Sequence, residues 1–222
     1  MQWFRKKNKL PEVEAWGLRF KHPVGFRPAA TGRRLWGNWH GRIPASFVTL
    51  TSPKEDILPW IGQLQQYRNR TVLAVNLSND IARSFSLVYD FADLIIIEPD
   101  SDNGIGAPDI SDTTQLMDEI TSLRLCYERY TPVLLRFSHG ISNEDMLDLL
   151  ASCRLFGIDG AVAPGAEKVR LLQTETLGRL PIIGAATTVE EALACLCGGA
   201  TLTEVQMSPI LMNKVLKNLT LQ

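Results

Sequence analysis

The sequence predicts an α/β fold, specifically a compact (β/α)8 TIM barrel with shortened loops at the carboxyl ends of its strands. Short apolar runs rich in Val, Ile and Leu recur along the chain, and each is followed by a polar or glycine-containing turn and then a helical pattern. This alternation is typical of a parallel sheet covered by helices. An open doubly wound sheet is the alternative, but no glycine-rich dinucleotide turn follows an early strand, so a closed barrel is favoured.

Eight apolar runs are expected to form the barrel strands. Most of them are continuous apolar stretches without polar alternation, as expected for strands that are buried on both faces. Their β-branched content and the nearby proline and glycine favour strand over buried helix. They span residues 23–26, 46–51, 71–76, 93–98, 132–137, 160–163, 181–184 and 201–206.

Helices are expected between these strands, and three have clear start signals. Ser52-Pro53 predicts an N-cap followed by proline at the first helical position. Ser142 precedes early acidic residues and an apolar spacing of three and four. Thr188 and Glu191 have the spacing of a capping box. The connection at 27–45 shows no helical period and is expected to be an irregular loop.

Length and charge indicate one ordinary globular domain. The 222 residues can form a single core, so we expect one domain over 1–222, with an N-terminal tip at 1–15 that frays. The net charge is −1, from 23 basic and 24 acidic residues. This balance gives no electrostatic reason to expect nucleic acid or an anionic membrane as a partner. The sequence leaves the oligomeric state open.

The four cysteines indicate a reduced, cytoplasmic protein. They form no C-x2-C pair, and the three histidines are scattered, so no metal site is expected. No apolar run approaches the ~20 residues of a membrane span. The tip Met1–Lys9 combines two aromatic residues with four positive charges. A membrane-surface contact is one interpretation of it, but a solvated terminus is favoured because the segment is short.

A collinear set of short motifs resembles one enzyme family. The first is Gly17-Leu-Arg-Phe-Lys-His-Pro-Val-Gly25. The others follow in order at 74–77, 95–103, 132–136, 157–160, 178–184, 191–193 and 199–200. Together they resemble the dihydroorotate dehydrogenases, and most closely the quinone-using, membrane-associated class. This chain is shorter than those enzymes, and its site motifs diverge.

The resemblance implies a fold, a reaction and site residues. It implies a barrel that uses FMN to oxidise dihydroorotate to orotate in pyrimidine biosynthesis. It places Ser101 on the catalytic base and Asn103 and Asn76 on substrate-binding asparagines. It also places Arg136 and Gly184 on positions that contact the cofactor. The structural alternatives stay open, because Ser and Asn are turn formers and Asn76 is equally suited to an Asx turn or N-cap.

Five departures from the family pattern argue against a working flavin site. In the family pattern, one lysine that reaches the flavin follows the first strand, and it is missing here. A second such lysine follows the fifth strand, and Arg136 replaces it; arginine is not a conservative replacement for this lysine. Paired glycines that hold the FMN phosphate are also lost, and every added Cβ obstructs a close phosphate approach. The affected segments are 29–32, Arg136, 163–166, 185–187 and 206–207.

Three hypotheses of function therefore remain. One is an active flavin oxidoreductase, and the second is a pseudoenzyme whose barrel serves as a non-catalytic binding or interaction module. The third is a different barrel activity on a phosphorylated ligand. The last uses Arg33–Arg42, a loop with two tryptophans, a histidine and three arginines that is suited to a planar anion at the barrel mouth. The alternative for that loop is a tryptophan plug over an emptied pocket.

Overall fold

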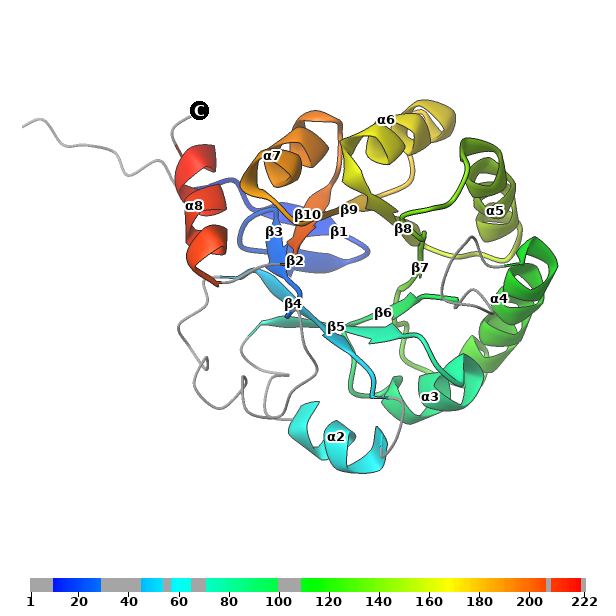
Figure 1. The fold of residues 1–222 in the computed structure, drawn as a ribbon. Helices are drawn as coiled ribbons and strands as arrows, with labels where there is room; N and C mark the ends of the chain where they lie inside the picture. The colour runs from blue at the N-terminus through cyan, green and yellow to red at the C-terminus, as the bar shows by residue number, and fades with distance from the viewer. Residues whose placement is uncertain are drawn as a thin grey trace, which may run out of the picture.

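The structure is a closed eight-stranded parallel barrel, as the sequence predicts. The computed structural model describes residues 10–28, 45–53, 57–64, 71–99, 109–206 and 209–220. The ring closes because β10 pairs with β3 as well as with β9, which rules out the open sheet (Figure 1). The barrel strands are β3 (Val24–Phe26), β4 (Phe47–Thr51), β5 (Val72–Leu77), β6 (Leu94–Ile97), β7 (Val133–Arg136), β8 (Gly160–Pro164), β9 (Ile182–Ala186) and β10 (Leu202–Val205).

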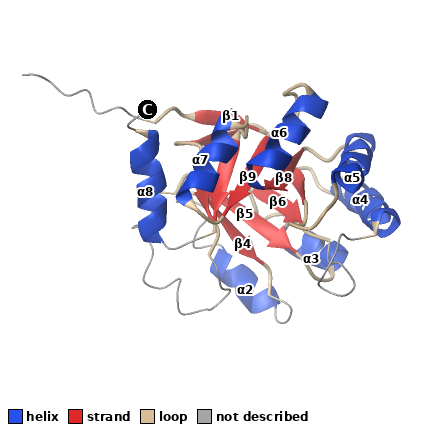
Figure 2. Ribbon diagram, turned by 45° about the horizontal axis from the view of Figure 1, so that its top comes forward, coloured by secondary structure: helices blue, strands red, loops and turns tan. Residues whose placement is uncertain are grey.

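One helix follows each strand from β4 onward, and together these helices surround the barrel (Figures 1 and 2). They are α2 (Ile57–Leu64), α3 (Ile81–Val88), α4 (Ile110–Arg124), α5 (Asn143–Leu155), α6 (Gly165–Thr176), α7 (Val189–Cys197) and α8 (Pro209–Leu219). The predicted irregular connection after the first strand falls mainly in 29–44, outside the described residues.

Two of the three predicted helix starts are confirmed. The Ser142 hydroxyl accepts a hydrogen bond from the backbone N–H of Asp145, and the Thr188 hydroxyl accepts one from that of Glu191. Pro53, which the prediction makes the first helical residue, is not helical; α2 is described from Ile57, and residues 54–56 lie outside the described residues. The backbone N–H of Ser52 instead donates to the Asn76 carbonyl at 2.8 Å, so the chain continues the sheet at this point.

An N-terminal hairpin closes the amino end of the barrel. Its strands are β1 (Val13–Ala15) and β2 (Leu18–Phe20), joined through two residues with positive φ, Trp16 and Gly17. The Trp16 indole donates to the Asp159 carbonyl at 2.9 Å, and the Phe20 ring meets the Phe47 ring edge-on at the start of β4. Residues 13–15 of the expected frayed tip therefore belong to a strand, and residues 1–9 lie outside the described residues.

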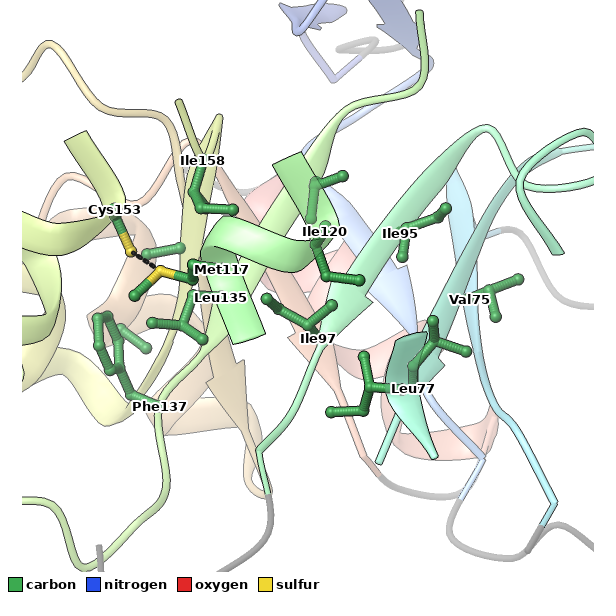
Figure 3. Close-up of a cluster of buried hydrophobic side chains, with 14 of the residues drawn as sticks. Val75, Leu77, Ile95, Ile97, Met117, Ile120, Leu135, Phe137, Cys153 and Ile158 are labelled. Atoms are coloured by element: carbon green, nitrogen blue, oxygen red, sulfur yellow. Dashed lines mark hydrogen bonds between the residues drawn. The ribbon is translucent and has the colours of Figure 1, made fainter. Parts of the chain in front are cut away.

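The core has one layer outside the barrel and one inside it. Outside, apolar side chains of the strands pack against the helices, as Figure 3 shows for Ile95 and Ile97 of β6 against Met117 and Ile120 of α4. Inside, apolar side chains from seven of the eight strands fill the part of the barrel that lies next to the hairpin. These are Phe47, Ala74, Leu94, Ile96, Leu134, Val162, Ile183 and Leu202, with Phe20 of the hairpin.

Candidate functional site

The inward-facing positions change from apolar to polar toward the carboxyl ends of the strands. Because side chains alternate along a strand, the residue two after an inward apolar one also faces inward. Ala74 is followed in this way by Asn76, Leu134 by Arg136 and Leu202 by Glu204. The carboxyl ends of the strands are the end at which barrel enzymes build their sites.

Arg136 lies at the centre of this polar layer and has partners on two sides. Its Nη2 lies 2.8 Å and 3.1 Å from the two carboxylate oxygens of Glu204. Its Nε donates to the Asn76 Oδ1 at 2.8 Å. The Arg136 side chain is 5% exposed and that of Glu204 is 1% exposed, so this ion pair is sealed inside the barrel.

A second ion pair continues the network toward solvent. The Asn76 Nδ2 donates to the Glu98 Oε2 at 2.6 Å. The Arg27 Nη2 donates to the same oxygen at 3.2 Å and to the Thr51 hydroxyl at 3.3 Å. Burial alone would raise the pKa of Glu98, but the nearby Arg136 and Arg27 outweigh it and hold this pKa below its ordinary value.

These five residues, Arg27, Asn76, Glu98, Arg136 and Glu204, are called the mouth cluster below. The two arginines and two glutamates balance in formal charge. Burial and the charge of Arg136 lower the pKa of Arg27, while Glu204 and Glu98 act in the opposite direction. Both polar atoms of the Asn76 side chain are used within the cluster. The arrangement therefore meets the polar needs of this buried amide internally.

The structure brings two of the predicted site residues together. Asn76 and Arg136 are hydrogen-bonded to each other, although they are 60 positions apart in the chain. Sequence reasoning did not identify Arg27, Glu98 or Glu204 as site residues. A signal was present for Glu204, because a charged residue in the apolar run 201–206 alternates with Leu202 and must face the same side.

Gly184 has a packing role that is independent of any cofactor. A Cβ at this position would lie 2.5 Å from the Cβ of Cys195 and 2.8 Å from its sulfur. The glycine therefore lets α7 approach β9 closely. Its predicted contact with the cofactor stays a prediction. Ser101, Asn103 and the loop Arg33–Arg42 lie outside the described residues.

The Glu191 side chain is hydrogen-bonded to the segment to which the resemblance assigns the FMN phosphate. The resemblance places this phosphate at residues 185–187, ahead of α7. There the Glu191 carboxylate accepts hydrogen bonds from the Thr187 backbone N–H at 2.8 Å and from its hydroxyl at 3.1 Å. A Cβ at Gly165, where α6 begins, would lie 3.3 Å from the other Glu191 oxygen. The misfit to FMN lies one step earlier in the chain, because Ala185 and Ala186 stand where the family pattern has paired glycines and their Cβ atoms obstruct a close phosphate approach.

The described residues contain no group of side chains that suits a metal ion. Within them, His, Cys, Asp and Glu side chains never gather in threes in a way that suits a metal ion. The same part of the chain contains no helix with the length and apolar character needed to cross a membrane.

Comparisons with known proteins agree with the sequence motifs. No protein-family model matches the chain. A curated relative, the dihydroorotate dehydrogenase (quinone) of Thermosynechococcus vestitus, is 22% identical over 302 aligned positions, which cover 98% of this chain and 83% of the relative. Because this chain has 222 residues, the alignment leaves gaps in it, as expected for a shortened chain.

Solved structures share the barrel. The crystal structure of DHODH from Eimeria tenella in complex with ferulenol matches with a TM-score of 0.71 and 14% identity, covering 99% of this chain and 84% of that one. The ligand-free DHODH of the same organism matches with a TM-score of 0.64 and 13% identity, covering 96% and 85%. The sequence match and the shared barrel agree with the collinear motifs: the chain is similar over 98% of its length to a dihydroorotate dehydrogenase, and it has the barrel fold of the two solved DHODH structures.

Proposed function

We propose that this chain is a non-catalytic relative of the dihydroorotate dehydrogenases, whose barrel serves as a binding module and whose flavin-dependent oxidation is lost or severely weakened. The observation that carries the proposal is the mouth cluster. Asn76 and Arg136, which the resemblance assigns to substrate and cofactor, are hydrogen-bonded to each other and to buried carboxylates.

A ligand at the mouth cluster would have to displace hydrogen bonds that the chain already makes there. A flavin or substrate atom that approached Arg136 or Asn76 would compete with hydrogen bonds that involve charged groups in a buried site. Such bonds contribute about 1.5–3 kcal/mol each. An anionic ligand would also meet the carboxylates of Glu98 and Glu204, and like charges in a water-poor site repel strongly.

The predicted base does not offset these losses. Ser101 is a serine, and a serine needs a neighbouring group that takes its proton before it can act as a base. Asp100 and Asp102 flank it in the sequence, but the family pattern has no such flanking acids. Ser101 and Asn103 thus stay as predictions for the alternative, an active dehydrogenase.

The proposal extends to partners and compartment. We infer that a binding role would use a small molecule at the barrel mouth, and we expect neither nucleic acid nor a membrane as the partner. All four cysteines are free thiols, and Cys126 and Cys197 are exposed, which is consistent with a reducing, cytoplasmic compartment.

An absorbance spectrum tests the proposal directly. The purified chain should be colourless between about 350 and 500 nm. It should also stay so after incubation with FMN and removal of free cofactor, and it should not reduce a dye acceptor when dihydroorotate is supplied. A bound flavin spectrum together with dihydroorotate-dependent dye reduction would refute the proposal. If reduction is seen, Ser101→Ala is the matched variant, because only chemistry at this site would be lost with that hydroxyl.

A further inference from the structure

Arg136 has the surroundings of a bound-anion site, with the anion supplied by the chain. Its guanidinium extends from β7 toward β10, and two strands, β8 and β9, separate these two along the barrel wall. Both Glu204 oxygens lie within 3.1 Å of the Arg136 Nη2. A planar guanidinium is well suited to holding a carboxylate in this way.

The remaining contacts fix the guanidinium in place. Asn76 on β5 accepts from the Arg136 Nε, so the cation is held by side chains from two different strands. Glu98 lies farther off, with its Oε2 3.8 Å from that Nε, and it is engaged by Arg27 and Asn76. The Thr49 hydroxyl, from an inward position on β4, is buried and has no hydrogen-bond partner among the described residues. The barrel interior therefore contains a fixed cation, Arg136, and a further hydroxyl, that of Thr49, which can form a hydrogen bond.

We propose that Arg136 forms an internal anion site selective for carboxylates, and that Glu204 is its resident ligand. A buried guanidinium without a counter-ion is strongly unfavourable, so the barrel requires an anion at this point. The Glu204 side chain is that anion, and it excludes a free carboxylate ion from the site. A small carboxylate will enter the site once the Glu204 carboxylate is removed.

The inference goes beyond the proposed function and does not depend on it. It concerns the ion that neutralises Arg136, and it would hold equally for a chain that binds flavin elsewhere in the mouth. The test below measures folding stability, whereas the test of the proposed function measures flavin absorbance and dye reduction. The two can therefore fail separately.

The test is chemical rescue of a truncated side chain. Glu204→Ala removes a methylene and a carboxylate, which are together the heavy atoms of one acetate ion. Thermal and urea unfolding are followed with increasing sodium acetate, against sodium chloride at equal ionic strength. We expect Glu204→Ala to be less stable than wild type in chloride and to regain stability in acetate. Above the dissociation constant, each tenfold rise in acetate should lower the unfolding constant about tenfold.

Two matched variants define the result. Glu204→Gln keeps the volume of the side chain and leaves no room for acetate, so it should respond to acetate no more than wild type does. Arg136→Met combined with Glu204→Ala keeps the room but removes the cation, so it should also lose the response. If Glu204→Ala does not fold in chloride, refolding in acetate replaces the titration, and recovery in acetate alone supports the site.

Several outcomes would overturn the inference. The first is that acetate stabilises Glu204→Ala no more than chloride does. The second is that acetate stabilises Glu204→Gln or the double variant as much as it stabilises Glu204→Ala. The third is that Glu204→Ala fails to refold in acetate while Glu204→Gln folds normally.

Discussion

Removing Arg136, the more deeply buried of the two cations of the mouth cluster, should destabilise the fold far more than removing an exposed cation. Arg136→Met leaves the Glu204 carboxylate, which is 1% exposed, without its counter-ion. Breaking a buried ion pair from one side typically costs about 3–5 kcal/mol. The Asn76 oxygen also loses the donor of its 2.8 Å hydrogen bond, and an unsatisfied buried acceptor costs about 1–3 kcal/mol. We therefore expect a loss of at least about 3 kcal/mol in the free energy of unfolding.

A double variant separates the charge effect from the loss of packing. Arg136→Met combined with Glu204→Leu removes both charges and fills the space with apolar atoms, a replacement that is often neutral or stabilising. Only the Asn76 oxygen is then left without its donor. We expect the double variant to lie within about 2 kcal/mol of wild type, well above Arg136→Met alone.

Urea unfolding followed by tryptophan fluorescence and by circular dichroism measures these differences, provided that the two signals report the same transition. Arg19→Met is the matched control. It breaks the Arg19–Glu14 ion pair, whose side chains are 73% and 72% exposed, and it should change stability little because surface pairs contribute little. The reasoning is refuted if Arg136→Met costs less than about 1 kcal/mol, or if the double variant is no more stable than Arg136→Met alone.

Three further changes test other parts of the fold. Gly25→Ala should cost about 1–3 kcal/mol, measured by urea unfolding, because its Cβ would lie 2.1 Å from the Phe47 ring; an unchanged midpoint would contradict this packing. Thr188→Ala should cost about 1 kcal/mol in the same assay by removing the α7 cap, while Thr188→Ser should retain most of the stability. The lowered pKa of Glu98 means that its contribution is present above the unfolded value, about 4.3, and is lost as the pH falls through the folded value. Glu98→Gln should therefore flatten the acid side of the stability profile, and an unchanged slope there would count against the ion pairing.

The barrel could be predicted because its strands have a strong local signal. Strands such as β6, with four consecutive apolar residues, are buried on both faces, and this produces runs that no surface segment shows. The hairpin was missed for the opposite reason. Its strands have three residues each. They are held in place by packing against the barrel, as the contacts of Trp16 and Phe20 show. Such tertiary support leaves little trace in local sequence.

The site was predictable residue by residue but not as a cluster. Asn76 and Arg136 were identified through family motifs, which indicate positions and not partners. The pairing of Arg136 with Glu204 joins residues 68 positions apart, and it depends on how far the strands are staggered when the barrel closes. No local pattern encodes this stagger. The predicted helix start at Ser52-Pro53 is tested only at Pro53, which is not helical, because residues 54–56 lie outside the described residues.

The mouth cluster also explains how a barrel can keep its fold while its site diverges. In a ligand-binding barrel, polar side chains at the strand ends are matched by the ligand, and without it they would be buried and unsatisfied. Here Asn76 uses both of its polar atoms within the protein, and Arg136 has a carboxylate and an amide as partners. The apolar layer and the hairpin beneath them form a separate, continuous core. A chain built in this way should not need a cofactor to fold, so its stability should be the same whether or not FMN is present during refolding.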